Sequence, residues 1–187
     1  MSAEVEASDR ASWRRWLREN HRRETSVWLV LHKKASPAPT VGYEEAVEEA
    51  LCYGWIDSRV EKLDELRRKQ LFTPRRPGSG WSKSNKDRVA HLIASKRMTK
   101  AGLALIEAAK ADGSWTALDA VEALEVPDDL RAALASNRAA RTNFSAFRPS
   151  VRKQLLSWIA SAKRPETRAK RIAETVAGAA ENRPATG

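Results

Sequence analysis

The sequence predicts an α+β protein, in which a small, mainly antiparallel β-sheet with packed helices is followed by an all-helical C-terminal half. Apolar, β-branched and alternating runs, which are typical of strands, occur between residues 25 and 76. From Trp81 onward, apolar residues recur every three or four positions, as on one face of a helix. The 187 residues, 42% of them hydrophobic, are enough for one large domain or two small ones.

Six elements are expected in the first half of the chain. Ser8 is suited to cap the first helix, and Gly54 to end the second, because glycine adopts the left-handed conformation that follows many helices. Residues 55–63 alternate, which places Asp57 and Arg59 on the same face of a strand. In order, the elements are helix 9–20, strand 25–34, loop 35–40, helix 43–54, strand 55–63 and its antiparallel partner, strand 69–76.

Helices follow in the second half. Ser84 is expected to cap a helix that ends near Arg97, and Thr99 to cap the next helix. Pro127 suits the first turn of a helix that ends near Asn137. The remaining helices are expected over 100–111, over 148–163 and from Pro165 onward. The predicted inward-facing residues of these helices are Val89, Leu92, Ile93, Leu103, Ile106, Ala109, Val151, Leu155, Trp158, Ile159, Ala162, Ala169, Ile172, Ala173, Val176 and Ala177. We therefore predict an α+β core domain over 9–137 and a C-terminal helical module over 138–182.

The net charge of +10 is distributed unevenly. Residues 71–110 and 131–187 are rich in Lys and Arg, whereas residues 111–130 carry acidic side chains only. One interpretation is a surface that binds a polyanion, with Arg168, Lys170 and Arg171 of the last helix as the contacts. The other is that the acidic block neutralises its basic neighbours and the rest is solvated.

Several classes of protein are disfavoured. A single cysteine, Cys52, permits no internal disulfide, and it lies near a helix C-terminus, where the dipole opposes a thiolate nucleophile. His21, His32 and His91 are far apart and have no metal-ligand spacing, so neither a metal nor a cofactor is expected. The N-terminus has no apolar signal region and no run is long enough to span a membrane, so we expect a cytoplasmic protein.

One segment has the composition of an anion site. In FTPRRPGSGWSKSN, Arg75 and Arg76 leave a strand, and a short loop leads to Trp81 and to a helix that begins between Ser82 and Asn85. Guanidinium groups and the unpaired N–H groups of a helix N-terminus both favour anions. With the strand residues just described, the candidate ligand site comprises Asp57, Arg59, Arg75, Arg76, Trp81, Ser82 and Asn85. A solvated loop with an ordinary helix cap is the alternative.

Five blocks follow one another along the chain: ALCYGWIDSRVEKLDE, FTPRRPGSGWSKSN, RMTKAGLALIEAAKADGSW, VPDDLRAAL and AKRPETRAKRI. Together, over about residues 10–182, they resemble the YdeI/OmpD-associated family, also called bacteriocin-protection proteins. Residues 140–182 are similar to the small helical module that gives the family its OmpD-associated name. The resemblance implies a cytoplasmic bacterial protein linked to tolerance of bacteriocins or antimicrobial peptides and to envelope stress, with no established catalytic activity, catalytic residue or cofactor.

Three functions follow from these observations. The favoured one is a non-enzymatic stress or protection protein that binds an anionic small ligand or a protein partner. The alternatives are a basic nucleic-acid-binding module and an enzyme that acts on an anionic substrate. The enzyme requires that Asp57, Arg75 and Asn85 share one pocket. Because a protein of charge +10 repels cationic peptides, protection by direct sequestration is disfavoured and an indirect route is expected.

Overall fold

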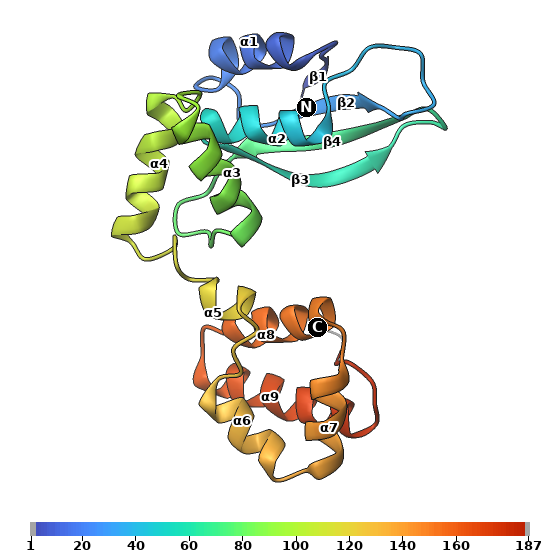
Figure 1. Ribbon diagram of the computed structural model, residues 1–187, viewed down its shortest axis with the longest axis vertical. Helices are drawn as coiled ribbons and strands as arrows, with labels where there is room; N and C mark the ends of the chain where they lie inside the picture. Colours follow the sequence, from blue (N-terminus) through green and yellow to red (C-terminus); the bar gives the residue numbers. More distant parts are fainter. Residues whose placement is uncertain (1–2, 186–187) are drawn as a thin grey trace. The chain divides into compact units, whose positions relative to one another are not determined.

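The computed structural model describes residues 3–185 and divides into two compact units, residues 1–116 and 117–187 (Figure 1). The predicted α+β class is confirmed: the sheet lies in the first unit, and the second unit is helical. The division falls after Thr116, whereas the sequence suggested a boundary after Asn137. The reason is that Val121 and Leu130 share one apolar core with Phe144, so the residues around them belong to the helical unit.

The first unit contains a four-stranded sheet and four helices. Its elements are β1 (Ala3–Glu6), α1 (Arg10–Asn20), β2 (Val27–His32), α2 (Tyr43–Cys52), β3 (Trp55–Lys62), β4 (Arg67–Pro74), α3 (Lys83–Ala94) and α4 (Lys100–Ala111). The strand order is β1-β2-β4-β3, with β1 parallel to β2 and the other pairs antiparallel. The sequence did not indicate β1, because this strand has only four residues, three of them exposed.

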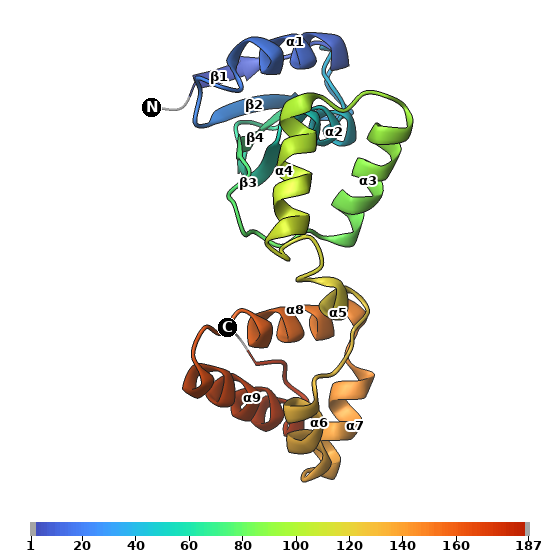
Figure 2. The same cartoon turned by 90° about the vertical axis from the view of Figure 1, so that its left-hand side faces the viewer.

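Helices α1 and α2 pack on the same face of this sheet (Figures 1 and 2). Alternate residues of β2 point toward them, and the large side chains of Trp13, Trp55 and Phe72 are fully buried in the shared core. The indole N–H of Trp13 donates to the carbonyl oxygen of Ala46, 3.0 Å away, so its polar atom is satisfied as well. Replacing such a residue by alanine typically costs ~3–5 kcal/mol, so these aromatics anchor the first unit.

Two helices begin at residues other than those expected. Asp9, not Ser8, caps α1: its carboxylate accepts the N–H of Ser12 at 2.7 Å, which is the stronger cap because the acceptor is charged. Ser82, not Ser84, caps α3, with its hydroxyl oxygen accepting an N–H at 3.3 Å. In both cases two residues suited to capping lie within two positions of each other.

The second unit consists of α5 (Asp119–Glu122), α6 (Asp128–Ala135), α7 (Arg138–Ala146), α8 (Pro149–Ala160) and α9 (Pro165–Ala180). Its core is formed by Leu130, Leu134, Phe144, Leu155, Leu156, Ile159 and Ile172. Helix α7 was not expected, since its nine residues include only one large apolar side chain that is buried, Phe144. Among the described residues, no helix is long and apolar enough to cross a membrane.

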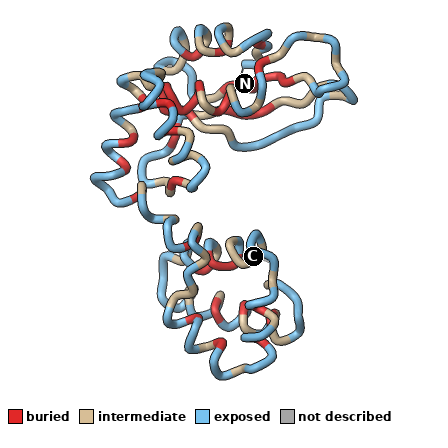
Figure 3. Tube along the Cα trace, in the orientation of Figure 1, coloured by how far each residue is buried: buried red, intermediate tan, exposed pale blue. Residues whose placement is uncertain are grey.

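Buried and exposed positions follow one another along the helices of each unit (Figure 3). Several residues expected to face inward are exposed. Ile93 is 46% exposed and Leu103 39%, because each lies at the edge of its helix's apolar face. The predicted inward stripe of helix α9 is right in part: Ile172 is buried and Val176 packs against the core, but Ala169, Ala173 and Ala177 are exposed. Thr175, which was not predicted to face inward, is buried. The exposed alanines form one wall of a cavity in the second unit, described below.

Candidate functional site

Gly54 joins the two most distinctive sequence blocks. It has a φ of 76°, and a Cβ at this position would lie 2.4 Å from Cδ1 of Leu105. Its carbonyl oxygen accepts the backbone N–H of Arg75 at 2.9 Å. The positive φ favours glycine here, whereas the close contact could be relieved by a movement of the Leu105 side chain. The hydrogen bond fixes the start of the arginine loop against the start of β3.

Cys52 is unsuited to nucleophilic chemistry. The residue is fully buried at the end of α2. Burial and the neighbouring Glu49 carboxylate raise the pKa of the thiol, and the nearby Arg14 guanidinium offsets this only in part. Because the thiolate is the reactive species, the raised pKa keeps Cys52 in its unreactive form.

Glu49 is the centre of a charged cluster that the sequence did not indicate. Its side chain is fully buried and accepts hydrogen bonds of 2.5 Å from Arg10 Nε, Arg14 Nη1 and Arg97 Nη2. Burial opposes ionisation, but the three guanidinium groups prevail and hold the pKa of Glu49 below its usual value. The cluster ties α1, α2 and the turn before α4 together. No local pattern reveals it, because Arg97 is distant in the chain from the other two arginines.

Asp57 and Arg59 do not share a strand face, contrary to the prediction. A β-bulge between Asp57 and Val60 shifts the alternation of β3. Asp57 faces α2 and accepts the phenolic hydrogen of Tyr43 at 2.7 Å. Arg59 lies over the ring of Trp28, with 5.7 Å between the guanidinium carbon and the ring centroid. Burial, followed by the hydrogen bond to Asp57, raises the pKa of Tyr43 to about 12.

Arg75 is turned inward. Its side chain is buried, stacks on Trp81 at 3.9 Å from the ring centroid, and donates from Nη2 to the carbonyl oxygens of Ser79 and Gly80. Burial alone lowers its pKa. The guanidinium thus holds the shape of its own loop, whereas Arg76 is exposed. Two of the residues predicted to contact an anion, Arg75 and Trp81, therefore stack on each other.

Asn85 belongs to a further local network. Its side-chain oxygen accepts Nη1 of Arg88 at 2.8 Å, and Arg88 binds the carboxylate of Glu44 at 2.6 Å. In the described part of the chain, no hydrogen bond or ion pair joins Asp57, Arg75 and Asn85 to one another. Each of these side chains instead binds partners close to it: Asp57 binds Tyr43, Arg75 binds the loop carbonyls, and Asn85 binds Arg88.

The basic residues of α9 are engaged to different degrees. Arg168 binds Asp129 through two parallel hydrogen bonds of 2.6 and 2.9 Å, which lower the pKa of this carboxyl. Arg171 donates from Nη1 to the carbonyl oxygen of Trp158 at 2.5 Å and stacks on that ring. Lys170 is 76% exposed, with Glu174 3.8 Å away. Two of the three residues predicted to contact a polyanion thus hold α9 against α6 and α8.

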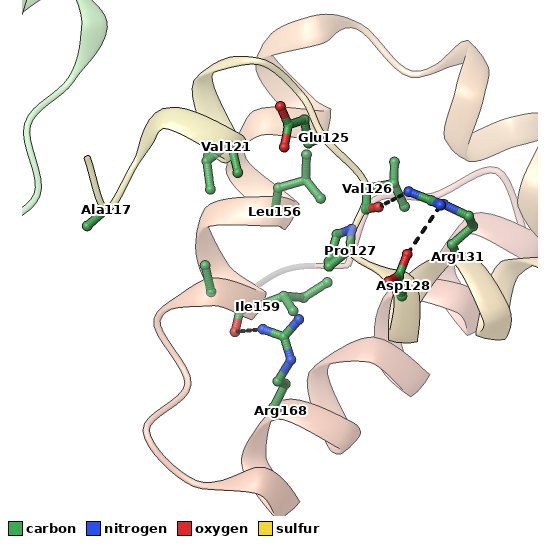
Figure 4. Close-up of a pocket in the computed structure, with 12 residues that line it drawn as sticks. Ala117, Val121, Glu125, Val126, Pro127, Asp128, Arg131, Leu156, Ile159 and Arg168 are labelled. Carbon is green, nitrogen blue, oxygen red and sulfur yellow. Dashed lines mark hydrogen bonds and ion pairs between the residues drawn. The ribbon is translucent and has the colours of Figure 1, made fainter. Parts of the chain in front are cut away.

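The helical unit contains a cavity of about 590 Å³ beside α5 and α8 (Figure 4). Its walls are largely apolar, and Val121, Leu156 and Ile159 lie around it. Charged groups lie at two of its sides: Arg168 donates to the carbonyl oxygen of Ile159, and Arg131 contacts Asp128. The volume lies within the ~300–1,000 Å³ range of small-molecule sites. Sequence reasoning missed this cavity, because it depends on how α5, α6, α8 and α9 pack together.

A second cavity, of about 790 Å³, lies between α6 and α9. Arg168 lines both cavities, and its bidentate pair with Asp129 stands at their shared border. Most of the side chains that line the second cavity are small or apolar, and they include the exposed alanines Ala169, Ala173 and Ala177. No group of three or more His, Cys, Asp or Glu side chains suited to a metal occurs among residues 3–185.

Two family models match the chain. Residues 5–105 match a domain of unknown function, DUF8412. Residues 123–182 match the family described as bacteriocin-protection, YdeI or OmpD-associated, which confirms the resemblance for the C-terminal part. The blocks around Gly54 and Arg75 fall within the first match, so the two matches correspond closely to the two compact units. Neither the curated proteins nor the solved structures include a match.

Proposed function

Because the chain belongs to the DUF8412 family and carries a C-terminal module of the bacteriocin-protection, YdeI or OmpD-associated family, we propose that it is a non-enzymatic binding protein of the bacterial cytoplasm that contributes to bacteriocin tolerance. Its proposed ligand is a small amphipathic molecule with an anionic head group. The observation that carries this proposal is the cavity of Figure 4, which lies in the part of the chain that matches the bacteriocin-protection family, apart from the α5 side.

The apolar walls favour a ligand with an apolar body. Val121, Leu156 and Ile159 are buried core residues that also line the cavity, so a ligand placed there extends an existing apolar core. Each 100 Å² of apolar surface removed from water contributes ~2.5 kcal/mol before the costs of binding. A cavity of this volume accommodates a molecule of drug-like size.

Arg131 is the residue best placed to hold the head group. Its ion pair with Asp128 has a separation of 3.2 Å, and both side chains are largely exposed. Such pairs contribute ~0–1 kcal/mol, so a ligand anion can replace the carboxylate at little cost. Arg168, in contrast, forms a bidentate pair with Asp129 and serves as a fixed wall.

The anionic, apolar dye 8-anilinonaphthalene-1-sulfonate is a suitable probe. We expect saturable fluorescence enhancement with one site per chain and a rise in melting temperature. Ala160→Phe places a ring at the exposed cavity wall without touching the buried core and should abolish the signal. Arg131→Gln should weaken binding several-fold. Ala146→Phe, on an exposed position of α7 that lines neither cavity, is the matched control. Equal binding by the wild type and Ala160→Phe would exclude the cavity as the site.

The cellular part of the proposal is tested separately. In bacteria that lack their own copy of the gene, expression of the wild-type chain should raise the bacteriocin dose that halves survival, and the Ala160→Phe variant should not. Fractionation of the same cells should recover the protein with the cytoplasmic contents. Equal protection by the wild type and by Ala160→Phe would show that bacteriocin tolerance does not depend on the cavity. Since the charge of +10 opposes capture of cationic peptides, the expected protection is indirect.

A further inference from the structure

The stretch between Asp129 and Glu166 contains no acidic residue. Four arginines lie within it on α7, the following turn and the first turn of α8: Arg138, Arg141, Arg148 and Arg152. We refer to residues 138–152 as the arginine segment. It includes none of the residues that line the cavity of Figure 4, so its role is independent of the ligand proposed above.

The exposed arginines occupy the outer side of α7. Arg138 and Arg141 are three residues apart and so are neighbours on the helix surface, and both are exposed, whereas Ala140 and Phe144 are buried. Arg148, in the turn before α8, is exposed as well. Over residues 3–185, none of these three guanidinium groups forms an ion pair. Their charges are therefore not neutralised within the chain, unlike that of Arg168.

The placement of these charges is unfavourable for the helices themselves. The N-terminus of a helix carries a partial positive charge, which acidic residues in the first turn normally offset. In the same unit, α5, α6 and α9 each have an acidic residue in the first turn, whereas α7 and α8 have none. Instead, α7 begins at Arg138 and α8 is preceded by Arg148. An anion that approached either position would be attracted by the side chain and by the helix terminus together.

Arg152 supports the segment from within. Its guanidinium lies over the ring of Phe144, with 5.7 Å between the guanidinium carbon and the centroid, and its buried Nε has no hydrogen-bond partner among the described atoms. Arg152 of α8 therefore packs against a core residue of α7. It is therefore left unchanged in the variants below, so that the apolar core stays intact.

We propose that the arginine segment binds the phosphate backbone of nucleic acid without regard to base sequence. A helix rises 1.5 Å per residue, so α7 extends roughly 12 Å from Arg138 to Ala146, two residues before Arg148, and this length spans several phosphates of one strand. An anionic membrane is the less suitable partner. Surface-bound helices insert an exposed apolar face, whereas the apolar face of α7 is buried and its outer side is polar.

The test is fluorescence anisotropy of the full chain with a 20-base-pair duplex of mixed sequence, between 50 and 300 mM NaCl. Each neutralised phosphate contributes about 0.9 to the slope of log affinity against log salt, so three or four arginines predict a slope of about −3 to −4. The triple variant R138Q/R141Q/R148Q should reduce the magnitude of this slope by about 2.7. The corresponding triple lysine variant, which keeps the charge, should retain the wild-type slope.

The matched control is R15Q/R22Q/K170Q, which removes the same charge from exposed positions outside the segment and should keep most of the slope. Circular dichroism melting is used to check that all three variants are folded. Three outcomes would overturn the proposal: no binding at 50 mM salt, an equal loss of slope in both glutamine triples, or an affinity and slope in R138Q/R141Q/R148Q that equal those of the wild type. If this variant instead lost binding only to phosphatidylserine vesicles, the segment would be a membrane contact.

Discussion

The carbonyl oxygen of Cys52 accepts the hydroxyl hydrogen of Thr99, and the backbone N–H of Thr99 points at the same oxygen from 3.3 Å. Thr99 is the N-cap of α4, as predicted, yet its hydroxyl binds the last turn of α2 instead of its own helix. One residue thus begins one helix and satisfies an orphan carbonyl of another. The two helices approach so closely that side-chain size becomes limiting at the next turn.

Gly102 marks this limit. A Cβ at this position would lie 2.6 Å from the carbonyl oxygen of Cys52 and 2.7 Å from that of Leu51, and neither backbone atom can move freely. We expect Gly102→Ala to destabilise the protein by about 1–3 kcal/mol in urea unfolding, although alanine favours helices by about 1 kcal/mol. Ala104→Gly, on an exposed side of α4, is the control and should cost about 1 kcal/mol. A Gly102→Ala protein as stable as the wild type would show that α4 does not pack this closely.

Glu49→Gln should cost about 3–5 kcal/mol, because it leaves three arginines around a buried site without their counter-ion. Glu48→Gln removes a single, partly exposed contact to Arg10 and is the matched control, with an expected cost of about 1 kcal/mol or less. Urea unfolding measures both. Similar losses in the two variants would contradict the central position of Glu49.

The same carboxylate predicts a pH dependence. Its folded-state pKa is below the ordinary value of 4.5, so its stabilisation is complete above pH 4.5 and is lost as the pH falls toward the lower, folded-state value. Urea unfolding between pH 3 and 7 should therefore show a steeper loss of stability for the wild type than for Glu49→Gln. Parallel profiles for the two proteins would mean that other acids control unfolding in this range.

Tyr43 should titrate near pH 12 because of its burial and its hydrogen bond to Asp57. The stability that this raised pKa provides is present below pH 10 and is lost as the pH rises through 12. Asp57→Asn removes the charge and should lower the pKa of Tyr43 toward 10, which absorbance at 295 nm can follow. The Tyr43→Phe variant identifies its share of the signal, since Tyr53 is the only other tyrosine. An unchanged titration in Asp57→Asn would exclude the carboxylate as a cause.

Cys52 should react very slowly with 5,5′-dithiobis(2-nitrobenzoate) in the folded protein at pH 7.5, and fully once the protein is unfolded in urea. Both its burial and its raised pKa oppose attack by the thiolate. One thiol per chain is the expected end point. Gly102→Ala is informative here too: if it opens the contact between α2 and α4, labelling of the native protein should accelerate.

Much of the fold could be predicted from local patterns. The strands that contain Trp28 and Phe72 and the helix that contains Cys52 follow from apolar periodicity, and Gly54 ends that helix as expected. What local patterns did not reveal has a physical cause. Simple alternation along β3 would place Arg59 on the same face as Asp57, but the bulge after Asp57 interrupts this alternation. Amphipathic spacing gives the approximate apolar side of α9, but its rotation depends on helices that contact it from elsewhere in the chain.

The candidate sites were harder to predict because they depend on distant residues. The arginine loop was identified, but Arg75 turns inward onto Trp81 and the loop carbonyls. Arg168 was identified as basic and outward-facing, but its partner Asp129 lies on another helix. The excess of positive charge between Asp129 and Glu166 was visible in the sequence, yet the unpaired arginines could be separated from the paired ones only by their contacts.

The strand order has a consequence for synthesis. β4 is the last strand to leave the ribosome, yet it lies between β2 and β3 and is the antiparallel partner of both. Until Pro74 has emerged, the six residues of β2, five of them buried in the finished sheet, have only the short parallel strand β1 beside them. The nascent chain must therefore shield an apolar segment while the next forty or so residues are translated, a window in which non-native pairing and chaperone binding compete with folding.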